Sequence, residues 1–499
     1  MFHILSAFVG YGALCASAAL LFGTFKITYN LFFHPLRRYP GPKTWAATRL
    51  AWAVSMQSGN LHRRLHELHQ EYGPIVRIAP NELSYIDARA WKDIFMSHTG
   101  DKVITKNGTW GKQPPGAPES IMSINEAAHT RHRRALMGAF TEHAVAEHAP
   151  ILEYFVGLMI SKFKEQAAVD GQAVVNIISW LDFLTFDISG ALSFGESFDC
   201  VKNGKAHPWV DITIAFGKGS TLVAAVNFFS PLDKLLKLAI PRSILKKVEY
   251  HKAIAKAKVQ QRLSVQDGTK SQDYVYSILQ YNRQKGEVKI SQEELEVDMS
   301  LLIFAGAETT SAAMASIFNA LLRHPSALRK VEDEVRKNFQ HEDEIKVETV
   351  AHLEYLTAVI EESVRLYPPA SLGIPRVIPK GGENICGQWV PGDTFVSLNQ
   401  YPAYRSPSNF NSPDSFVPER FTPQTPFPTD NMSAFQPFST GRHKCLGQKL
   451  AMAEMRLTIA RILFSFDINA AQEVRDFAEQ QTFFVWQRKP LNIGLKLRE

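Results

Sequence analysis

A long stretch without proline, residues 291–322, constrains the fold more than any other feature of the chain. Ser291 and Glu294 have the spacing of a capping box, in which each side chain binds the backbone N–H of the other residue and so starts a helix. Pro325 follows the stretch, and proline cannot continue a helix. A helix of this length is about 46 Å long, enough to cross an entire domain. Apolar side chains surround it at residues 301–304, which predicts that its middle is buried.

The other segments predict a mainly α protein with a small β region. Further helices are expected at 61–72, 326–339, 354–367 and 448–464, and short strands at 74–78, 82–86, 375–378, 394–398 and 482–486. The segments 74–78 and 82–86 flank Ala79-Pro80-Asn81 and have the pattern of a β-hairpin. No fixed-period repeat and no long Ser/Gly linker follows residue 43, which favours a single domain over 44–499.

The composition excludes several classes of protein. Of the 499 residues, 45% are hydrophobic and 21% charged, as in a globular protein, so the chain is not disordered. A net charge of +6 over this length gives no support for nucleic-acid binding. Four cysteines, none in CxxC spacing, cannot form a disulfide framework or a structural zinc site, and they suit a reducing compartment.

Residues 1–25 predict a membrane anchor. Residues 4–25 contain no charged side chain, and a helix of that length spans about 33 Å, enough to cross the hydrocarbon core of a bilayer. A cleaved signal peptide is the alternative, because Ala16-Ser17-Ala18 has the pattern of a cleavage site. Against it, no basic residue precedes the apolar run, and the run continues beyond that site. Basic residues after the run place the domain in the cytosol by the positive-inside rule, with the proline-rich residues 26–43 as a stiff, extended hinge.

The segment 438–447, with the sequence Phe-Ser-Thr-Gly-Arg-His-Lys-Cys-Leu-Gly, precedes the predicted helix 448–464. Cys445 therefore lies at a helix N-terminus, where backbone N–H groups and the helix dipole are expected to lower its pKa and stabilise a thiolate. Gly441 permits a turn with positive φ, and Gly447 permits close approach of a bulky planar group. Two alternatives stay open on these residues alone, a buried inert cysteine and a nucleophile.

The pattern of Phe438, Gly441, Cys445 and Gly447 resembles the haem-binding signature of the cytochrome P450 superfamily, with His443 at its usual basic position. The resemblance implies the cytochrome P450 fold and a haem b, iron protoporphyrin IX, whose axial ligand is the thiolate of Cys445. A thiolate ligand donates electron density that favours cleavage of the O–O bond. The proline-rich segment after the anchor is similar to that of fungal microsomal members that act in secondary metabolism.

Two further motifs follow the family's order. Glu362 and Arg365 lie three residues apart on one helix face, and Pro418-Glu419-Arg420-Phe421 comes before the cysteine segment. On spacing alone, Glu362 and Arg365 are as well explained by a surface ion pair. The resemblance implies instead a structural network of Glu362, Arg365 and Arg420 that supports the haem side of the core.

Within the long helix, the segment 305–310 reads Ala-Gly-Ala-Glu-Thr-Thr and resembles the family's oxygen-activating motif. Without that resemblance it reads as a helix turn weakened by Gly306, with an exposed glutamate. The chemical interpretation is that Gly306 and the Thr309 hydroxyl open the helix hydrogen bonds locally. The resemblance then implies that Thr309 binds dioxygen and that Glu308 connects to water, so that the two residues deliver protons.

The haem carries two propionates, and their burial requires cationic partners. His129 and Arg133 fit the family's W/H-x-x-x-R motif, and Arg376 and His443 complete the expected set. Histidine at 129 in place of tryptophan is the one departure from the pattern. A basic patch on the cysteine side, suited to an acidic electron donor, is expected from Arg131, Arg134, Arg442, Lys444 and Lys449.

The resemblance implies a monooxygenase that hydroxylates or epoxidises a lipophilic small molecule, such as a terpenoid or polyketide, using O2 and NADPH-derived electrons. No convincing GxGxxG unit follows a strand, so the electrons are expected to come from a separate reductase. The resemblance implies that this is an NADPH-dependent flavoprotein in the endoplasmic reticulum membrane, with cytochrome b5 as a further donor. Apolar pocket candidates are Phe304, Ala305, Leu372, Ile374 and Phe484, and each is equally explained as plain core.

The segment 227–239 is expected to dip into the bilayer through Phe228, Phe229, Leu232, Leu235, Leu236 and Leu238. Two other functions are weighed against the monooxygenase. One is a haem-thiolate isomerase or dehydratase that needs no reductase, which has no use for the proton relay of Glu308 and Thr309. The other is a non-catalytic protein that binds haem or a lipophile.

Overall fold

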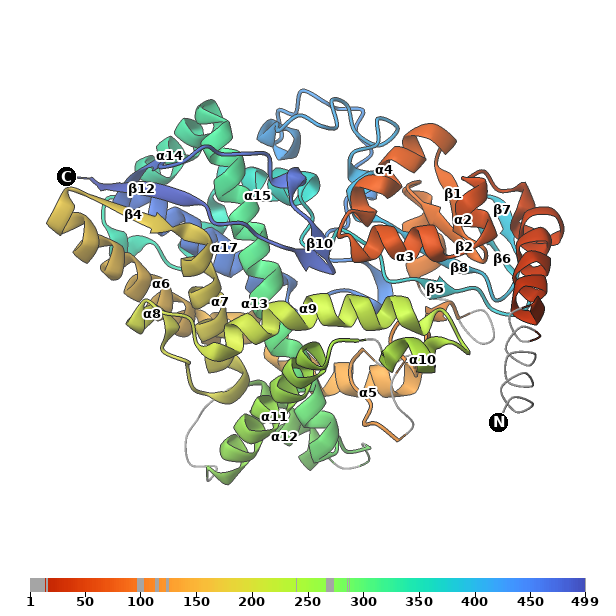
Figure 1. Cartoon of the computed structure of the whole chain (residues 1–499). Helices are drawn as coiled ribbons and strands as arrows, with labels where there is room; N and C mark the ends of the chain where they lie inside the picture. The colour runs from red at the N-terminus through yellow and green to blue at the C-terminus, as the bar shows by residue number, and fades with distance from the viewer. Residues whose placement is uncertain are drawn as a thin grey trace, which may run out of the picture.

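The structure is a computed structural model, and it describes residues 14, 17–96, 103–112, 116–122, 125–238, 240–265, 273–284, 286 and 288–498. Over these residues the fold is mostly helical, with four small groups of strands. Most of the long helices lie on one side of the molecule, and the largest sheet lies on the other with the N-terminal segment (Figure 1). The predicted class, mainly α with a small β region, is confirmed.

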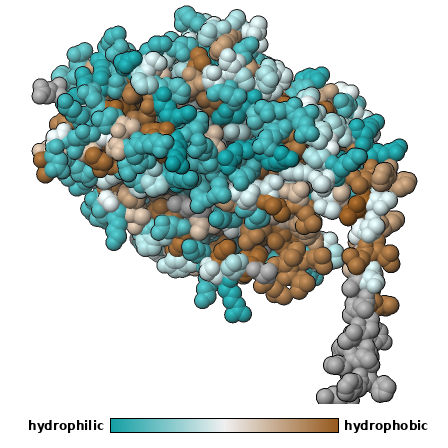
Figure 2. Space-filling view, turned by 45° about the horizontal axis from the view of Figure 1, so that its top comes forward, coloured by the Kyte–Doolittle hydropathy of each residue, from teal (hydrophilic) through white to brown (hydrophobic). Residues whose placement is uncertain are grey.

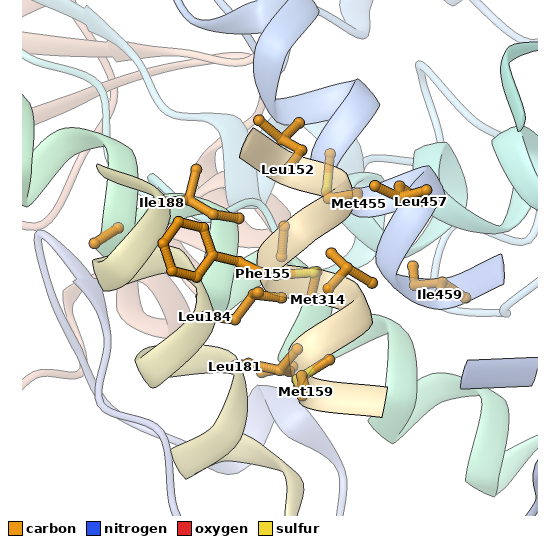
Figure 3. Close-up of a cluster of buried hydrophobic side chains, with 14 of the residues drawn as sticks. Leu152, Phe155, Met159, Leu181, Leu184, Ile188, Met314, Met455, Leu457 and Ile459 are labelled. Carbon is orange, nitrogen blue, oxygen red and sulfur yellow. The ribbon is translucent and has the colours of Figure 1, made fainter. Parts of the chain in front are cut away.

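Four helices form the centre of the core, namely α6 (Glu142–Asp170), α7 (Ile177–Phe194), α13 (Gln292–Arg323) and α17 (Gln448–Ser465). Buried leucine, isoleucine, methionine and phenylalanine side chains from all four meet between them (Figure 3). Burying each such side chain contributes about 1.5–3 kcal/mol. The core therefore holds α13, which contains Glu308 and Thr309, in a constant position relative to α17, which follows Cys445.

Further α-helices lie around this centre or, as the first three of them in the chain do, beside the large sheet (Figure 1). They are α2 (Lys43–Ala47), α3 (Leu50–Gln57), α4 (Leu61–Tyr72), α5 (Glu126–Met137), α8 (Cys200–Asn203), α9 (Pro208–Asn227), α10 (Asp233–Leu238), α11 (Arg242–Ser264), α12 (Tyr274–Arg283), α14 (Pro325–Asn338), α15 (Glu354–Leu366) and α16 (Gln400–Tyr404). The capping box predicted at Ser291 and Glu294 is present at the start of α13.

The largest sheet has the strand order β1-β2-β8-β5-β3, formed by Ile75–Ala79, Glu82–Tyr85, Phe395–Leu398, Arg376–Val377 and Thr105–Lys106. β1 and β2 form the predicted antiparallel hairpin, whereas β2 and β8 are parallel. At the edge of the sheet, Lys106 of β3 lies directly opposite Arg376 of β5. This register brings two basic side chains together beside the candidate site.

Three smaller groups complete the β region. β4 (Gln172–Asn176), β12 (Asn492–Leu497) and β9 (Phe466–Ala470) form an antiparallel sheet, and β6 (Glu383–Ile385) pairs with β7 (Gln388–Val390). β10 (Thr482–Phe483) pairs with β11 (Val485–Trp486). The single strand predicted at 482–486 is therefore wrong. The chain reverses at Phe484, which adopts a φ of 73° and joins the two short strands.

The proline-rich segment also differs from the prediction. Pro35–Arg38 forms a 3-10 turn rather than extended chain, because the fixed φ of proline suits the first position of a helix. Leu36 and Tyr39 are buried in the cluster beneath the large sheet. Residues 35–39 are thus packed on the domain, and the extended form predicted for the segment is not present there.

Most of the predicted anchor, residues 4–25, lies outside the described residues. Residues 17–28 are helical, and Leu20, Leu21, Phe22 and Phe25 are exposed. In the described part of the chain, three other helices are long and apolar enough to cross a membrane, namely α7, α9 and α13. α7 and α13 are mostly buried inside the protein, so core packing accounts for their apolar character.

A buried ion pair joins α5 to α13. The Nδ1 atom of His132 lies 2.5 Å from Oδ2 of Asp298, and both side chains are fully buried. Burial lowers the pKa of His132, but the hydrogen bond and charge of Asp298 and the charge of Glu294 oppose it, and the net pKa is raised. The charged pair therefore stabilises the contact between the two helices.

The pKa of His132 predicts a pH dependence of stability. Because the folded-state pKa lies above the unfolded value of 6.5, the stabilisation is complete below 6.5 and is lost as the pH rises through the folded-state pKa. We expect wild type to lose stability relative to His132→Gln over that range, measured by urea denaturation at several pH values. Parallel pH profiles for the two proteins would contradict the assignment.

Candidate functional site

One face of α13 is left uncovered in the middle of the helix. Ile303, Phe304 and Ala307 are buried, whereas Ala305 and Gly306 are exposed and Thr309 is half-buried. The Thr309 hydroxyl donates a hydrogen bond to the carbonyl of Ala305 at 2.7 Å. Residues 305 and 309 are one helical turn apart, so the uncovered surface is a single patch with the threonine hydroxyl beside it.

The cysteine segment forms a tight loop before α17. The Cys445 N–H donates to the carbonyl of Phe438 at 2.8 Å, which closes the loop. Gly441 has a φ of 69°, and a Cβ atom there would lie 2.0 Å from the carbonyl oxygen of Phe95. Glycine is therefore required at 441 both for its conformation and for its close contact. Gly447 caps α17, as the predicted helix start requires.

The sulfur of Cys445 faces hydrogen-bond donors at the start of α17. The N–H groups of Gly447 and Gln448, together with the charges of Arg133 and Lys444, favour the thiolate. Cys445 itself is exposed, but neighbouring protein atoms still reduce the hydration of its sulfur. Burial is the largest influence and raises the pKa of the thiol. The predicted lowering of this pKa is thus wrong for the protein alone, and a cation at the sulfur is needed to favour the thiolate.

A cluster of mostly basic side chains lies beside the cysteine loop and includes all four predicted propionate partners. Its basic members are His129, Arg133, Arg376 and His443, as predicted, and Lys106 and Arg442, which were not predicted as propionate partners. Burial lowers the pKa of His129 to about 3 and that of His443 to about 4, so both imidazoles are neutral, and the carboxylate of Glu126 lies among these side chains. Arg133 donates to the carbonyl of Lys444 at 2.7 Å, and His129 Nε2 lies 3.0 Å from His443 Nδ1. Arg376, Arg442 and His443 line one small cavity together with apolar residues.

The positive charge of this cluster is not balanced by the described protein residues. Lys106 and Arg376 face each other across β3 and β5, and like charges in that position destabilise a sheet. Burial and then the nearby Arg376 lower the pKa of Lys106 to about 7, and burial lowers that of Arg376 to about 10. Arg376 Nε and His129 Nδ1 are buried and have no hydrogen-bond partner among the described residues. This donor set fits a ligand with two negative charges.

Glu126, His129 and His443 place their potential ligand atoms within 4.8 Å of one another, which is close enough to hold a metal ion. The surrounding charge argues against that use. Lys106 and Arg376 both add positive charge at this point and disfavour a further cation. The cluster is better suited to carboxylates than to a metal.

The structure brings Glu362, Arg365 and Arg420 together in a fully buried network. Arg365 binds both carboxylate oxygens of Glu362, at 2.6 and 2.8 Å, and Arg420 Nε lies 3.3 Å from Glu362 Oε2. Arg365 also donates to the carbonyls of Tyr404 and Pro413. The network therefore ties α15 to the segment that leads into the cysteine loop.

Glu308 does not have the solvent contact expected from the sequence. It is buried, and Arg488 donates to its Oε2 atom at 2.7 Å and to its backbone carbonyl at 3.1 Å. Nη2 of Arg488, the nitrogen that binds Oε2 of Glu308, also lies 3.1 Å from Oδ1 of Asp182 on α7. Burial and the nearby Asp182 raise the pKa of Glu308 to about 7 against the opposing charge of Arg488. No sequence motif identified Asp182 or Arg488, because they lie far from Glu308 along the chain.

The pocket candidates are only partly brought together. The rings of Phe304 and Phe484 lie 6.0 Å apart, and Phe304 directly precedes the uncovered Ala305 in the middle of α13. Leu372 packs against a separate cluster with residues of α3 and α9. Ile374 is half-buried. Phe304 and Phe484 are thus the pair that the described structure supports most directly.

The expected basic patch is reduced by internal ion pairs. Arg131 binds Glu294, Arg442 binds Glu126, and Lys449 binds Glu142. Lys444 is exposed beside Cys445 and lines a groove with Phe438, Gln448 and Arg456. The cysteine side therefore presents less uncompensated positive charge than the sequence predicts.

Comparison with known proteins identifies similar chains. The sequence profile described as "Cytochrome P450" matches residues 40–495. The chain is 37% identical to the cytochrome P450 monooxygenase atr2 of Stereocaulon alpinum over 96% of this chain and 95% of that protein. It is 35% identical to the cytochrome P450 monooxygenase lcsI of Purpureocillium lilacinum, over 99% and 96% of the two chains. It is 36% identical to averantin hydroxylase of Dothistroma septosporum, over 99% and 92%.

The buried network of Glu362 predicts a large loss of stability on neutralisation. Glu362→Gln leaves the charge of Arg365 unpaired in the core, and breaking a buried pair costs about 3–5 kcal/mol. We expect a decrease of that size in the free energy of unfolding, measured by guanidinium denaturation. Glu419→Gln is the control, because Glu419 pairs with the exposed Lys330 at the surface. Equal effects of the two substitutions would contradict the proposed difference.

Proposed function

The chain belongs to the cytochrome P450 family, and we propose that this monooxygenase uses a haem bound by Cys445, O2 and electrons from a separate NADPH-dependent reductase to oxidise a lipophilic small molecule. Hydroxylation or epoxidation is the reaction class. The proposal places the enzyme in fungal secondary metabolism, and its relatives include a protein named averantin hydroxylase.

The observation that carries the proposal is the pairing of a donor-surrounded thiol with an unbalanced set of buried cations. Cys445 offers sulfur to iron, and the iron charge would offset the burial that disfavours the thiolate. Lys106, Arg133, Arg376 and His129 would bind the two propionates and use the unpartnered Nε and Nδ1 atoms. The residues present therefore fit a haem. When bound, the haem supplies the redox chemistry that activates dioxygen.

Residues of α13 are proposed to deliver protons. Thr309 holds its hydroxyl at the uncovered face of the helix and can turn it from the Ala305 carbonyl toward a ligand. Glu308, with a pKa of about 7, can both release and accept a proton near neutral pH. We assign proton delivery to these two residues.

Apolar side chains support a lipophilic substrate. Phe304 precedes the uncovered Ala305, its ring lies 6.0 Å from that of Phe484, and the ring of Phe216 lies 5.5 Å from that of Phe304. An aromatic wall of this kind excludes water and favours apolar ligands, with a terpenoid or polyketide as the proposed class.

The proposed location is the endoplasmic reticulum membrane, with the domain in the cytosol. Leu232, Leu235 and Leu238 of the α10 region are exposed, and so are Leu50 and Val54 of α3. Figure 1 shows α10 on the same side as the N-terminal helix, and Figure 2 shows an apolar area beside that helix. Phe228 and Phe229, predicted to enter the bilayer with the leucines, instead pack inward against the α3 cluster.

An electron donor is proposed to dock near Lys444. This lysine is exposed beside Cys445, at a groove that also contains Arg456. A carboxylate-rich surface on the reductase or on cytochrome b5 would complement it.

Replacement of the proposed ligand tests the haem assignment. Cys445→Ala is expected to lose the long-wavelength thiolate band of the reduced carbon-monoxide difference spectrum, because no sulfur remains to bind the iron. Cys386→Ala, which removes a buried cysteine away from the proposed ligand, is expected to keep it. Retention of the band in Cys445→Ala, or nitrogen-bound iron in wild type, would overturn the proposal.

Replacement of Thr309 tests the proton relay. In Thr309→Ala we expect the share of NADPH electrons recovered in product to fall by about tenfold or more, with peroxide formed instead, because positioned proton donors contribute about 100-fold or more. Product, peroxide and NADPH are measured with added reductase and a lipophilic substrate found by screening. Thr310→Ala is the control, since Thr310 is buried on another face of α13. Unchanged coupling in Thr309→Ala would refute the role.

A further inference from the structure

Arg488 connects two carboxylates that come from different helices. Its Nη2 atom lies 2.7 Å from Oε2 of Glu308 on α13 and 3.1 Å from Oδ1 of Asp182 on α7. Ser311, one helical turn after Glu308, donates its hydroxyl to the same Asp182 oxygen at 2.5 Å. A single guanidinium nitrogen thus serves both acids, and a hydroxyl fixes the position of the second one.

The charges of this cluster do not balance when both acids are ionised. One guanidinium faces two carboxylates in the described part of the chain, and the Arg488 side chain is only 3% exposed. Asp211 of α9 adds a further negative charge near Asp182. A buried group with net negative charge is costly, and binding one proton removes that charge.

The pKa values of the two acids also favour one bound proton. Burial and the neighbouring acid raise the pKa of Glu308 to about 7, while the pKa of Asp182 is raised by burial and by Asp211 against the charge of Arg488. Two acids this close titrate as a pair that holds one proton over a range of pH.

We propose that Asp182 and Arg488 are positioning residues that form, with Glu308, a site storing one proton beside Thr309. The inference rests on the proposed relay role of Glu308 and explains how that residue is protonated. Arg488 orients the Glu308 carboxyl group, and the negative charge of Asp182 keeps the proton on the pair. After Glu308 gives up its proton, the cluster carries the extra negative charge that draws the next proton from solvent.

The stored proton is tested in the resting ferric holoenzyme by infrared titration of the carboxyl C=O band. The expected band titrates near neutral pH and is lost in Glu308→Gln. Asp182→Asn removes the repelling charge and is expected to lower the midpoint by about one pH unit or more, whereas Arg488→Gln raises it. Arg488→Lys keeps the charge and is expected to titrate close to wild type.

A matched control separates this band from that of another buried acid. Glu454 of α17 also has a raised pKa, of about 8, caused by burial. Glu454→Gln removes its own contribution and is expected to leave the near-neutral band and its response to Asp182→Asn unchanged. Asp182→Asn itself neutralises the cluster, so it is expected to fold and to keep the thiolate spectrum even if Arg488→Gln does not fold.

Turnover gives the second readout. The pH at which coupling of NADPH to product falls by half is expected to move down in Asp182→Asn and up in Arg488→Gln, a pair of opposite shifts that a merely structural role does not produce. An unmoved band and an unmoved pH profile in Asp182→Asn would overturn the shared site, even if Thr309→Ala uncouples. If Thr309→Ala and Glu308→Gln both remain fully coupled, the relay itself fails, whatever the infrared band shows.

Discussion

The carboxylate of Glu362 is the contact on which the haem side of the molecule depends. It is fully buried between two guanidinium groups, and it also accepts the backbone N–H of Val417 at 2.9 Å. A buried charge of this kind is tolerated only when all of its partners are present, so it permits one arrangement of α15 and the segment 404–420. That segment precedes the cysteine loop in the chain, and the geometry of the loop depends on Gly441 packing against Phe95.

The two sides of the site carry opposite charge excesses. Beside the cysteine loop, Lys106, Arg133 and Arg376 outnumber the described carboxylates, while next to Thr309 two acids share Arg488. The positive excess beside the cysteine loop is neutralised by a bound dianion. The negative excess beside Thr309 is neutralised by a bound proton. The protein thus prepares both cofactor binding and proton supply through charges that its own residues leave uncompensated.

The features that could be predicted from the sequence are those encoded locally. The capping box of α13, the β1–β2 hairpin and the spacing of Glu362 and Arg365 depend on residues within a few positions of each other. Lys106 and Arg488 could not be found in this way, because a two-residue strand and a C-terminal segment place them at the site. The direction of the Cys445 pKa could not be predicted either, since desolvation of the sulfur outweighs the N–H groups of the helix terminus that the sequence reveals.

The turn at Phe484 joins two parts of the site in one short segment. Its ring meets Phe304 in the proposed pocket, and Arg488, four residues later, grips Glu308. A ligand that displaces the ring of Phe484 also moves the segment that carries Arg488, which binds Glu308. Redesign of this turn to change the oxidised position of the substrate is therefore expected to change the protonation of Glu308 as well. An exchange of the turn with that of a relative should keep Phe484 and Arg488 together.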